Sequence, residues 1–306
     1  MERIVSLEKN TPEMETKPRQ VLDDLTVIIP TVGRNILQRC LQAIADGAIL
    51  PACIIVIDQG DNLLVADWLN HLKTLGLESL HLRSTEKGPA SARNLGLERV
   101  QTPFVAAIDD DCIAEKDWLK MMEMQLHQNP GFIITGRVEP AGDGIAPTVV
   151  TSDIPRLYRR PSVRIPSPLT SGNMGVALQT ARTIGLFDTG LITAEDNDWA
   201  YRALRASVPI LYAPDVIVYH YHWRNKTELA TTYRSYALGQ GAFYGKHLRK
   251  GDWSMVLGIA ISMFRGLRDL FYGVIKNNYT QRLNGITRVI WLLPGLVDGL
   301  RGLRSS

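Results

Sequence analysis

The sequence predicts an α/β protein with a doubly wound, mixed but mainly parallel sheet, followed by a C-terminal helical tail. Short runs of β-branched apolar residues recur from residue 25 onward and alternate with amphipathic segments. Strands that are apolar throughout are typical of a parallel sheet whose two faces are covered by helices. In such sheets ligands bind at the carboxyl ends of the strands, so we expect functional residues directly after them.

The order of the elements follows from this periodicity. We expect strands over 25–30, 53–58, 80–84 and 103–109, and helices over 35–46, 62–75, 90–100 and 114–128. After 132–138, a Pro-rich stretch over 139–170 predicts a long loop. Beyond the loop we expect a strand over 173–178, helices over 179–184 and 195–206, and a closing pair of strands at 208–213 and 215–222.

Composition limits the class of protein. With 306 residues, of which 45% are hydrophobic and 21% charged, the chain is not a wholly disordered or low-complexity protein. Its three cysteines have no zinc-site spacing and cannot form a disulfide framework, so we expect a reducing, cytoplasmic compartment. Residues 1–23 lack the apolar run of a signal peptide and are expected to be a disordered leader. The expected domains are a catalytic domain at 24–223 and a basic helical region at 224–306.

The basic charge belongs to the tail. Residues 224–306 have a net charge of +9, whereas the residues before them have a net charge of −6. The apolar runs of the tail, 253–264 and 289–297, are shorter than the roughly 20 residues that span a bilayer. Basic residues alternate with apolar ones here, at Arg265, Arg268, Lys276, Arg282 and Arg288. This pattern is typical of helices that lie in an anionic membrane surface, the alternative being packing on the fold or on a second subunit.

The chemistry-bearing residues form two acidic groups. Asp109, Asp110 and Asp111 directly follow the strand expected at 103–109. Adjacent carboxylates repel one another, so they suit a divalent cation that binds carboxylate and phosphate oxygens, or else an acidic helix cap. Glu195 and Asp196 begin a predicted helix, where acidic residues also act as caps. Beside the small residues of SGNMGVAL, a carboxylate there suits the base of a sugar pocket.

Seven segments occur in a characteristic order and spacing. They are VIIPTVGR (27–34), VIDQGD (56–61), KGPASARNLGL (87–97), AIDDDC (107–112), SGNMGVA (171–177), GLFDTGL (185–191) and AEDNDWAYR (194–202). Together they closely resemble the family 2 glycosyltransferases of the GT-A fold, over about residues 24–223. The resemblance implies a nucleotide-diphospho-sugar transferase fold. It also implies an inverting transfer of a sugar from a nucleotide-sugar donor, with UDP expected, to a hydroxyl of a glycan or lipid-linked acceptor.

The resemblance also implies roles at the donor site. Pro30 and Thr31 would line the nucleotide site, Asp58 would contact the base, and Arg93 would lie near the diphosphate. Asp109 and Asp111 match the DxD pair around Asp110; Asp111 would hold Mg²⁺ or Mn²⁺, and Asp109 would lie near the donor's ribose or sugar. Asp110 is a further candidate residue of the donor site, and Asp109 and His220 are further candidate metal ligands.

Asp196 matches the family's general base, and Glu195 beside it is the second candidate catalytic residue. His220 and His222 have the same orientation in a strand, so spacing does not choose between them as a metal ligand. The segment DQGD at 58–61 replaces the DDGS of many relatives, which leaves the donor's base open. The QxxRW motif of processive synthases is absent, which favours transfer of single sugars.

Two other classes of function are less well supported. A sugar nucleotidyltransferase needs a Gly-rich, Arg-containing loop after the first strand, which PTVGRN matches poorly, and neither GxGxxG nor a P-loop is present there. An inactive membrane-surface scaffold of the same fold would have lost a carboxylate, but Asp109, Asp111 and Asp196 are all present. No nucleic-acid recognition motif accompanies the basic charge. We therefore expect an enzyme that is peripheral on the cytoplasmic face of a membrane.

Overall fold

The computed structural model describes residues 19–142, 144, 149–163, 168–222 and 225–302. A disordered leader was predicted over residues 1–23, and residues 1–18 of it lie outside the described residues. For the last residues of that segment the prediction is wrong, because strand β1 (Gln20–Val21) pairs in parallel with β3 (Ile49–Leu50). The backbone groups of these residues gain partners that a disordered leader would not have.

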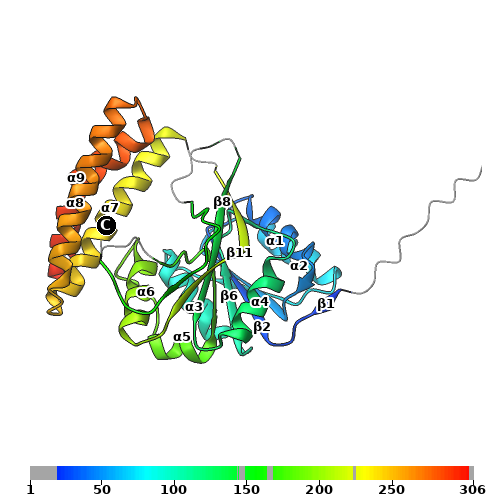
Figure 1. The fold of residues 1–306 in the computed structure, drawn as a ribbon. Helices are drawn as coiled ribbons and strands as arrows, with labels where there is room; N and C mark the ends of the chain where they lie inside the picture. The colour runs from blue at the N-terminus through cyan, green and yellow to red at the C-terminus, as the bar shows by residue number, and fades with distance from the viewer. Residues whose placement is uncertain (1–18, 143, 145–148, 164–167, 223–224, 303–306) are drawn as a thin grey trace, which may run out of the picture.

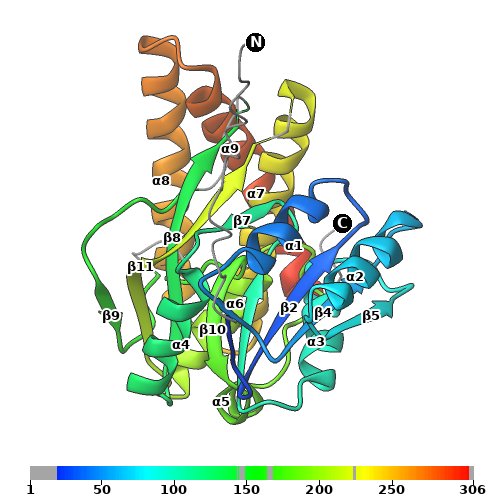
Figure 2. The same ribbon diagram turned by 90° about the vertical axis from the view of Figure 1, so that its right-hand side faces the viewer.

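A mixed sheet forms the centre of the molecule (Figure 2). Its strand order is β5-β4-β2-β6-β10-β8-β11-β7, and β9 pairs with β11. The strands are β2 (Leu25–Thr31), β4 (Cys53–Asp58), β5 (Ser79–Arg83), β6 (Phe104–Ile108), β7 (Cys112–Ala114), β8 (Ile133–Ala141), β9 (Arg156–Tyr158), β10 (Asn173–Ala177) and β11 (Ile210–Tyr221). The first four strands in this order run parallel, while β10 is antiparallel to both of its neighbours. The carboxyl ends of β2, β4 and β6 therefore share one edge.

The closing pair of strands predicted at 208–213 and 215–222 is instead one strand, β11. Its parallel register with β8 shifts between Ala213 and Ile217, on either side of Pro214. Proline has no N–H to donate, so it interrupts the ladder, and this produces a turn-like signal within a continuous strand. The short strands β7 and β9 were not predicted, and β9 lies within the segment expected to be a loop.

Helices cover both faces of the sheet, which confirms the doubly wound prediction. The helices of this layer are α1 (Leu37–Ala45), α2 (Leu64–Thr74), α3 (Pro89–Arg99), α4 (Trp118–Gln128), α5 (Leu178–Ile184) and α6 (Glu195–Arg205). Side chains of α1, α2 and α4 form one apolar core with the sheet, and side chains of α3, α5 and α6 form a second. The central strands β2, β4 and β6 are therefore buried on both sides, as the sequence indicated.

The tail is helical and folds back on itself. Helices α7 (Lys226–Arg249), α8 (Ser254–Ile275) and α9 (Tyr279–Arg301) lie side by side in a layer of their own (Figure 1). The backbones of α7 and α9 touch at glycines: a Cβ added to Gly241 would lie 2.1 Å from the Leu292 carbonyl oxygen, and one added to Gly295 would lie 2.0 Å from that of Leu238. Only glycine permits so close an approach.

The surface of this helical layer exposes two apolar stripes. On α8 the stripe comprises Phe264, Leu267, Phe271 and Ile275, and on α9 it comprises Ile286, Ile290, Leu293 and Val297. The spacing of three or four residues places each set on one face of its helix. Within the described part of the chain, no helix is both long enough and apolar enough to cross a membrane.

Candidate active site

A cavity of about 1030 Å³ lies between the carboxyl edge of the sheet and helices α6–α9. Nearly all of the site residues expected from the sequence line it. These are Pro30, Thr31, Arg93, Asp109, Asp110, Asp111, Glu195, Asp196 and His220. Segments that are far apart in the chain therefore meet at one cavity. The carboxyl ends of β2 and β6 bring the first of them together, because they lie at the same edge of the sheet.

Asp58 is the predicted site residue that does not line this cavity. Its side chain is fully buried, and one carboxylate oxygen lies 3.1 Å from His81 Nε2 and 2.9 Å from Arg83 Nη1. The other oxygen accepts a hydrogen bond of 2.8 Å from the backbone N–H of Gly60. The neighbouring Gln59 lines the cavity instead. Contact of Asp58 with a nucleotide base remains a prediction.

Arg93 joins the two acidic groups. Its Nη2 atom lies 2.7 Å from Asp109 Oδ1, and its Nη1 atom lies 2.9 Å from Glu195 Oε1. Burial opposes the charge of this guanidinium, but Asp109 and Glu195 outweigh burial and raise the pKa of Arg93. Its Nε atom is buried and has no hydrogen-bond partner in the described part of the structure. Arg93 therefore fixes the end of β6 against the start of α6.

The middle carboxylate of the triplet is held at the end of β2. Thr31 donates a hydrogen bond of 2.6 Å to Asp110, and Arg34 Nη1 lies 2.6 Å from the other oxygen of Asp110 and 3.5 Å from Asp111. Burial raises the pKa of Asp110 to about 6, although Arg34 opposes the shift. Arg34 was missed as a site residue. Its signal was its place in PTVGR, directly after the first long strand.

The geometry distinguishes the two candidate histidines. His220 Nε2 lies 3.3 Å from Asp111 Oδ1, whereas His222 is buried with its ring 4.8 Å from that of His220. Among the residues that the structure describes, no three His, Cys, Asp or Glu side chains form a metal-binding group. Asp111 and His220 fit two positions of a divalent cation, whose remaining positions would need phosphate or water oxygens. Asp109 is engaged by Arg93 instead.

The candidate base lies at a strained turn. Ala194 adopts the left-handed conformation with φ of 66°, which residues with a Cβ rarely adopt, and α6 starts directly after it. Burial is the main cause that raises the pKa of both Glu195 and Asp196. Glu195 is buried against Arg93, whereas Asp196 is only partly buried and lines the cavity. Asp196 is therefore the better placed of the two to take a proton from a ligand.

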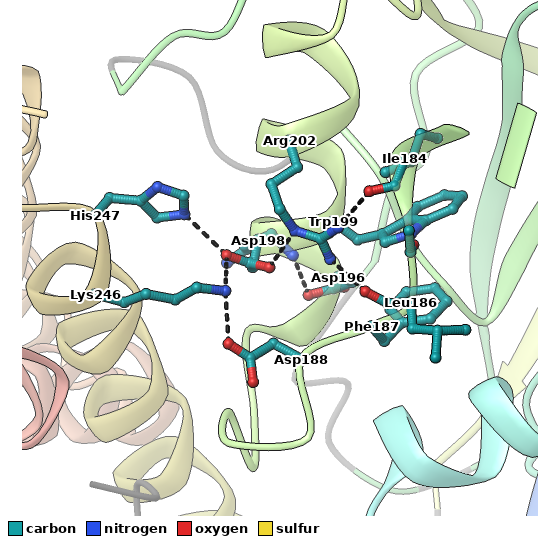
Figure 3. A network of polar contacts seen from close by, with 12 residues as sticks. Ile184, Leu186, Phe187, Asp188, Asp196, Asp198, Trp199, Arg202, Lys246 and His247 are labelled. Atoms are coloured by element: carbon teal, nitrogen blue, oxygen red, sulfur yellow. Dashed lines mark hydrogen bonds and ion pairs between the residues drawn. The ribbon is translucent and has the colours of Figure 1, made fainter. Parts of the chain in front are cut away.

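A polar network connects α6 with α7 (Figure 3). The fully buried Asp198 lies 2.5 Å from Lys246 Nζ, 2.8 Å from His247 Nε2 and 2.8 Å from Arg202 Nε. Burial alone would raise the pKa of Asp198, but the hydrogen bond with His247 and the charges of Lys246 and Arg202 hold it well below its ordinary value. No sequence pattern predicted this network, because its two halves lie in separate segments.

Comparison with known proteins identifies the family of the chain. Residues 26–179 match the family model described as "Glycosyl transferase family 2". The pre-mycofactocin glycosyltransferase of Mycobacterium tuberculosis is 27% identical over 231 residues, covering 72% of this chain and 46% of that protein. Glycosyltransferase AglE of Haloferax volcanii is 24% identical over 204 residues, covering 64% of this chain and 66% of that protein. The chain thus spans about half the length of the first of these relatives.

Solved structures share the fold. Staphylococcus aureus TarS 1-349 in complex with UDP superposes with a TM-score of 0.56 at 14% identity, covering 87% of this chain and 90% of that one. GalNAc-T7 with UDP, GalNAc and Mn²⁺ superposes with a TM-score of 0.52 at 15% identity, covering 74% of this chain and 51% of that one. At these identities the likeness establishes the architecture alone.

Proposed function

The chain belongs to glycosyl transferase family 2, and from this premise we propose that it transfers a sugar from a nucleotide-sugar donor to a hydroxyl of an acceptor, with inversion. The observation that supports this most directly is the single cavity in which Arg93 joins Asp109 to Glu195, next to Asp196. It combines a cationic group for a diphosphate with a carboxylate base. The UDP complexes of the solved relatives favour uridine as the donor's base.

In the proposed reaction, Asp196 takes the proton of the acceptor hydroxyl as its oxygen attacks the anomeric carbon. The glycosidic bond breaks on the opposite side, and its electron pair leaves with the nucleoside diphosphate. A carboxylate whose pKa is raised by burial is a stronger base than an exposed one, which suits this step. Glu195 is bound to Arg93 and acts as a positioning residue.

The leaving diphosphate gathers negative charge in the transition state. Arg93 and Arg34, at the carboxyl edge of the sheet, would stabilise that charge with groups that are already oriented. Mg²⁺ or Mn²⁺, when bound, would supply further stabilisation of the diphosphate. We propose Asp111 and His220 as the residues that hold it.

The helical layer is proposed to attach the enzyme to the cytoplasmic face of a membrane. The apolar stripes of α8 and α9 suit the acyl boundary, and the net charge of +9 suits anionic lipids. A surface so placed favours a lipid-linked acceptor over a soluble glycan.

The test is donor turnover by the full chain. A panel of UDP- and GDP-linked sugars is supplied with Mn²⁺, and release of the nucleoside diphosphate is measured with the wild type and with Asp196→Asn. We expect turnover of at least one UDP-sugar by the wild type, and loss of it in the variant. Tight UDP binding with no turnover of any donor, even with lipid-phosphate acceptors present, would favour the inactive scaffold.

A further inference from the structure

The cavity continues past the expected donor site to helices α8 and α9. Three arginines line this part of it: Arg265 and Arg268 of α8, and Arg288 of α9. We call them the arginine group. The sequence pattern left open whether these side chains meet a membrane surface or pack on the fold, and the packing of α8 on α9 places these three at the cavity. The proposed donor chemistry has no use for them.

The arginine group brings three positive charges together where α8 and α9 meet. A Cβ added to Gly266 would lie 3.4 Å from Arg288 Cβ, so α8 and α9 are in contact at this point. Asp269 is the only acidic residue of α8 and lies 2.7 Å from Arg268. Asp298 is the only acidic residue of α9, and it lies about 15 Å along the helix from Arg288. Asp269 is therefore the one carboxylate of these two helices that lies near the arginine group.

This charge is partly withdrawn from water. Burial lowers the pKa of Arg288, Asp269 opposes the shift, and the charges of Arg265 and Arg268 lower it further. A guanidinium nevertheless stays protonated at physiological pH. The cavity wall therefore holds a charged guanidinium that has lost part of its contact with water. A bound anion would offset the free-energy cost of that loss.

A line of polar side chains connects the arginine group with the candidate base. Asn197, which follows Asp196 in α6, donates a hydrogen bond of 3.0 Å to Gln240 of α7. One turn further along α7, the hydroxyl of Tyr244 lies near Gln240 and near Ser262 of α8, and the charges of Arg265 and Arg288 act on it. The base and the arginine group thus face one continuous space, lined by groups that can hydrogen-bond a polar ligand.

We propose that the arginine group is a subsite that holds the phosphate or diphosphate of an acceptor whose hydroxyl reaches Asp196. The proposal rests on the glycosyl transfer proposed above and names the class of acceptor. A phosphate monoester carries about −1.5 to −2 charges at pH 7, which is opposite in sign to the charge of the arginine group. A guanidinium group can donate two parallel hydrogen bonds to the oxygens of one phosphate. The apolar stripes on the same two helices favour a lipid as the carrier of that phosphate.

Calorimetry on the full chain, in EDTA and without any donor, tests this subsite. The probes are farnesyl phosphate, farnesol and glycerol 3-phosphate. We expect farnesyl phosphate to bind, and Arg288→Gln and Arg265→Gln each to weaken its binding about 10-fold or more, with Arg288→Lys in between. Arg282→Gln is the matched control on α9, because Arg282 is not among the residues that line the cavity, and it should bind like the wild type.

The outcomes separate the possibilities. Equal binding of farnesol and farnesyl phosphate would overturn the proposal, as would wild-type affinity in both Gln variants. Glycerol 3-phosphate binding as tightly as farnesyl phosphate would support the subsite and assign it to a soluble phosphate acceptor. Absence of UDP binding with Mn²⁺, measured separately, would reject the proposed transfer and leave the test of the subsite intact, because the titrations contain neither UDP nor Mn²⁺.

Discussion

The ammonium group of Lys246 in α7 lies 2.5 Å from the carboxylate of Asp198 in α6, and it also lies 2.6 Å from Asp188 (Figure 3). Asp198 is two residues from Asp196, the candidate base. The helical layer is therefore tied by buried charges to the helix on which the proposed chemistry depends. Changes in the packing of α7 are expected to reach Asp196 through this contact.

Asp198→Asn should lower the free energy of unfolding by about 3–5 kcal/mol at pH 7, because it removes the buried carboxylate that Lys246 and Arg202 share and leaves Lys246 with Asp188 alone. The pKa of Asp198 is held below its ordinary value, so its contribution is present above about pH 4 and is lost as the pH falls through the folded-state pKa. Urea denaturation between pH 7 and pH 3 measures this. The exposed Asp67→Asn is the control. A gap between Asp198→Asn and the wild type that stays constant over this range would contradict the assignment.

Asp196→Asn should reduce turnover by about 10²–10⁴-fold and leave UDP affinity unchanged, because the amide keeps the shape but cannot accept the proton. The pKa of Asp196 is raised, and the base acts when ionised, so wild-type turnover should rise with pH through that pKa. In the variant, the residual turnover should no longer rise with pH in this range. Initial rates with a saturating donor provide the measurement, and unchanged turnover would remove Asp196 from the mechanism.

Asp111→Ala should abolish the tightening of UDP binding by Mn²⁺, since a cation that bridges protein and diphosphate would lose its carboxylate. His220→Ala should weaken it, whereas His222→Ala should leave it close to the wild type, because His220 and not His222 lies against Asp111. Calorimetry with and without Mn²⁺ resolves the three variants. A larger effect of His222→Ala than of His220→Ala would reverse the choice between the histidines.

The doubly wound fold was predictable because the apolar runs of its strands and the periodicity of its helices are local properties. The convergence of Thr31, Arg93 and Asp109 was predictable too, since each closely follows a strand or a turn whose place in a parallel sheet is known. Strand β11 was predicted as two strands, because Pro214 gives the same local signal in a bulge as in a turn. Position in the chain could not reveal that Asp58 is enclosed by His81 and Arg83.

The tail shows the limit of pattern analysis more clearly. Spacing identified basic, amphipathic helices, but it could not tell which basic side chains face outward. Arg288 lines the cavity because α9 packs against α7 through glycines and against α8 at Gly266, and these contacts fix its rotation. The contact of Lys246 with Asp198 joins residues 48 positions apart, and only the folded structure brings them together.

The apolar stripes of α8 and α9 are exposed to solvent. Phe264→Ser with Phe271→Ser should reduce binding to anionic vesicles at high salt, because both side chains are exposed and their burial in lipid does not depend on charge. Binding at low salt should persist in part, because each Lys or Arg near such a surface contributes about 1 kcal/mol within a Debye length of about 10 Å. Flotation with phosphatidylglycerol and phosphatidylcholine vesicles measures both components. The thermal unfolding midpoint should not fall, since neither phenylalanine belongs to a buried core cluster. Wild-type flotation of the double variant at every salt concentration would mean that the stripes do not contact lipid, and failure of the wild type to float would reject membrane attachment altogether.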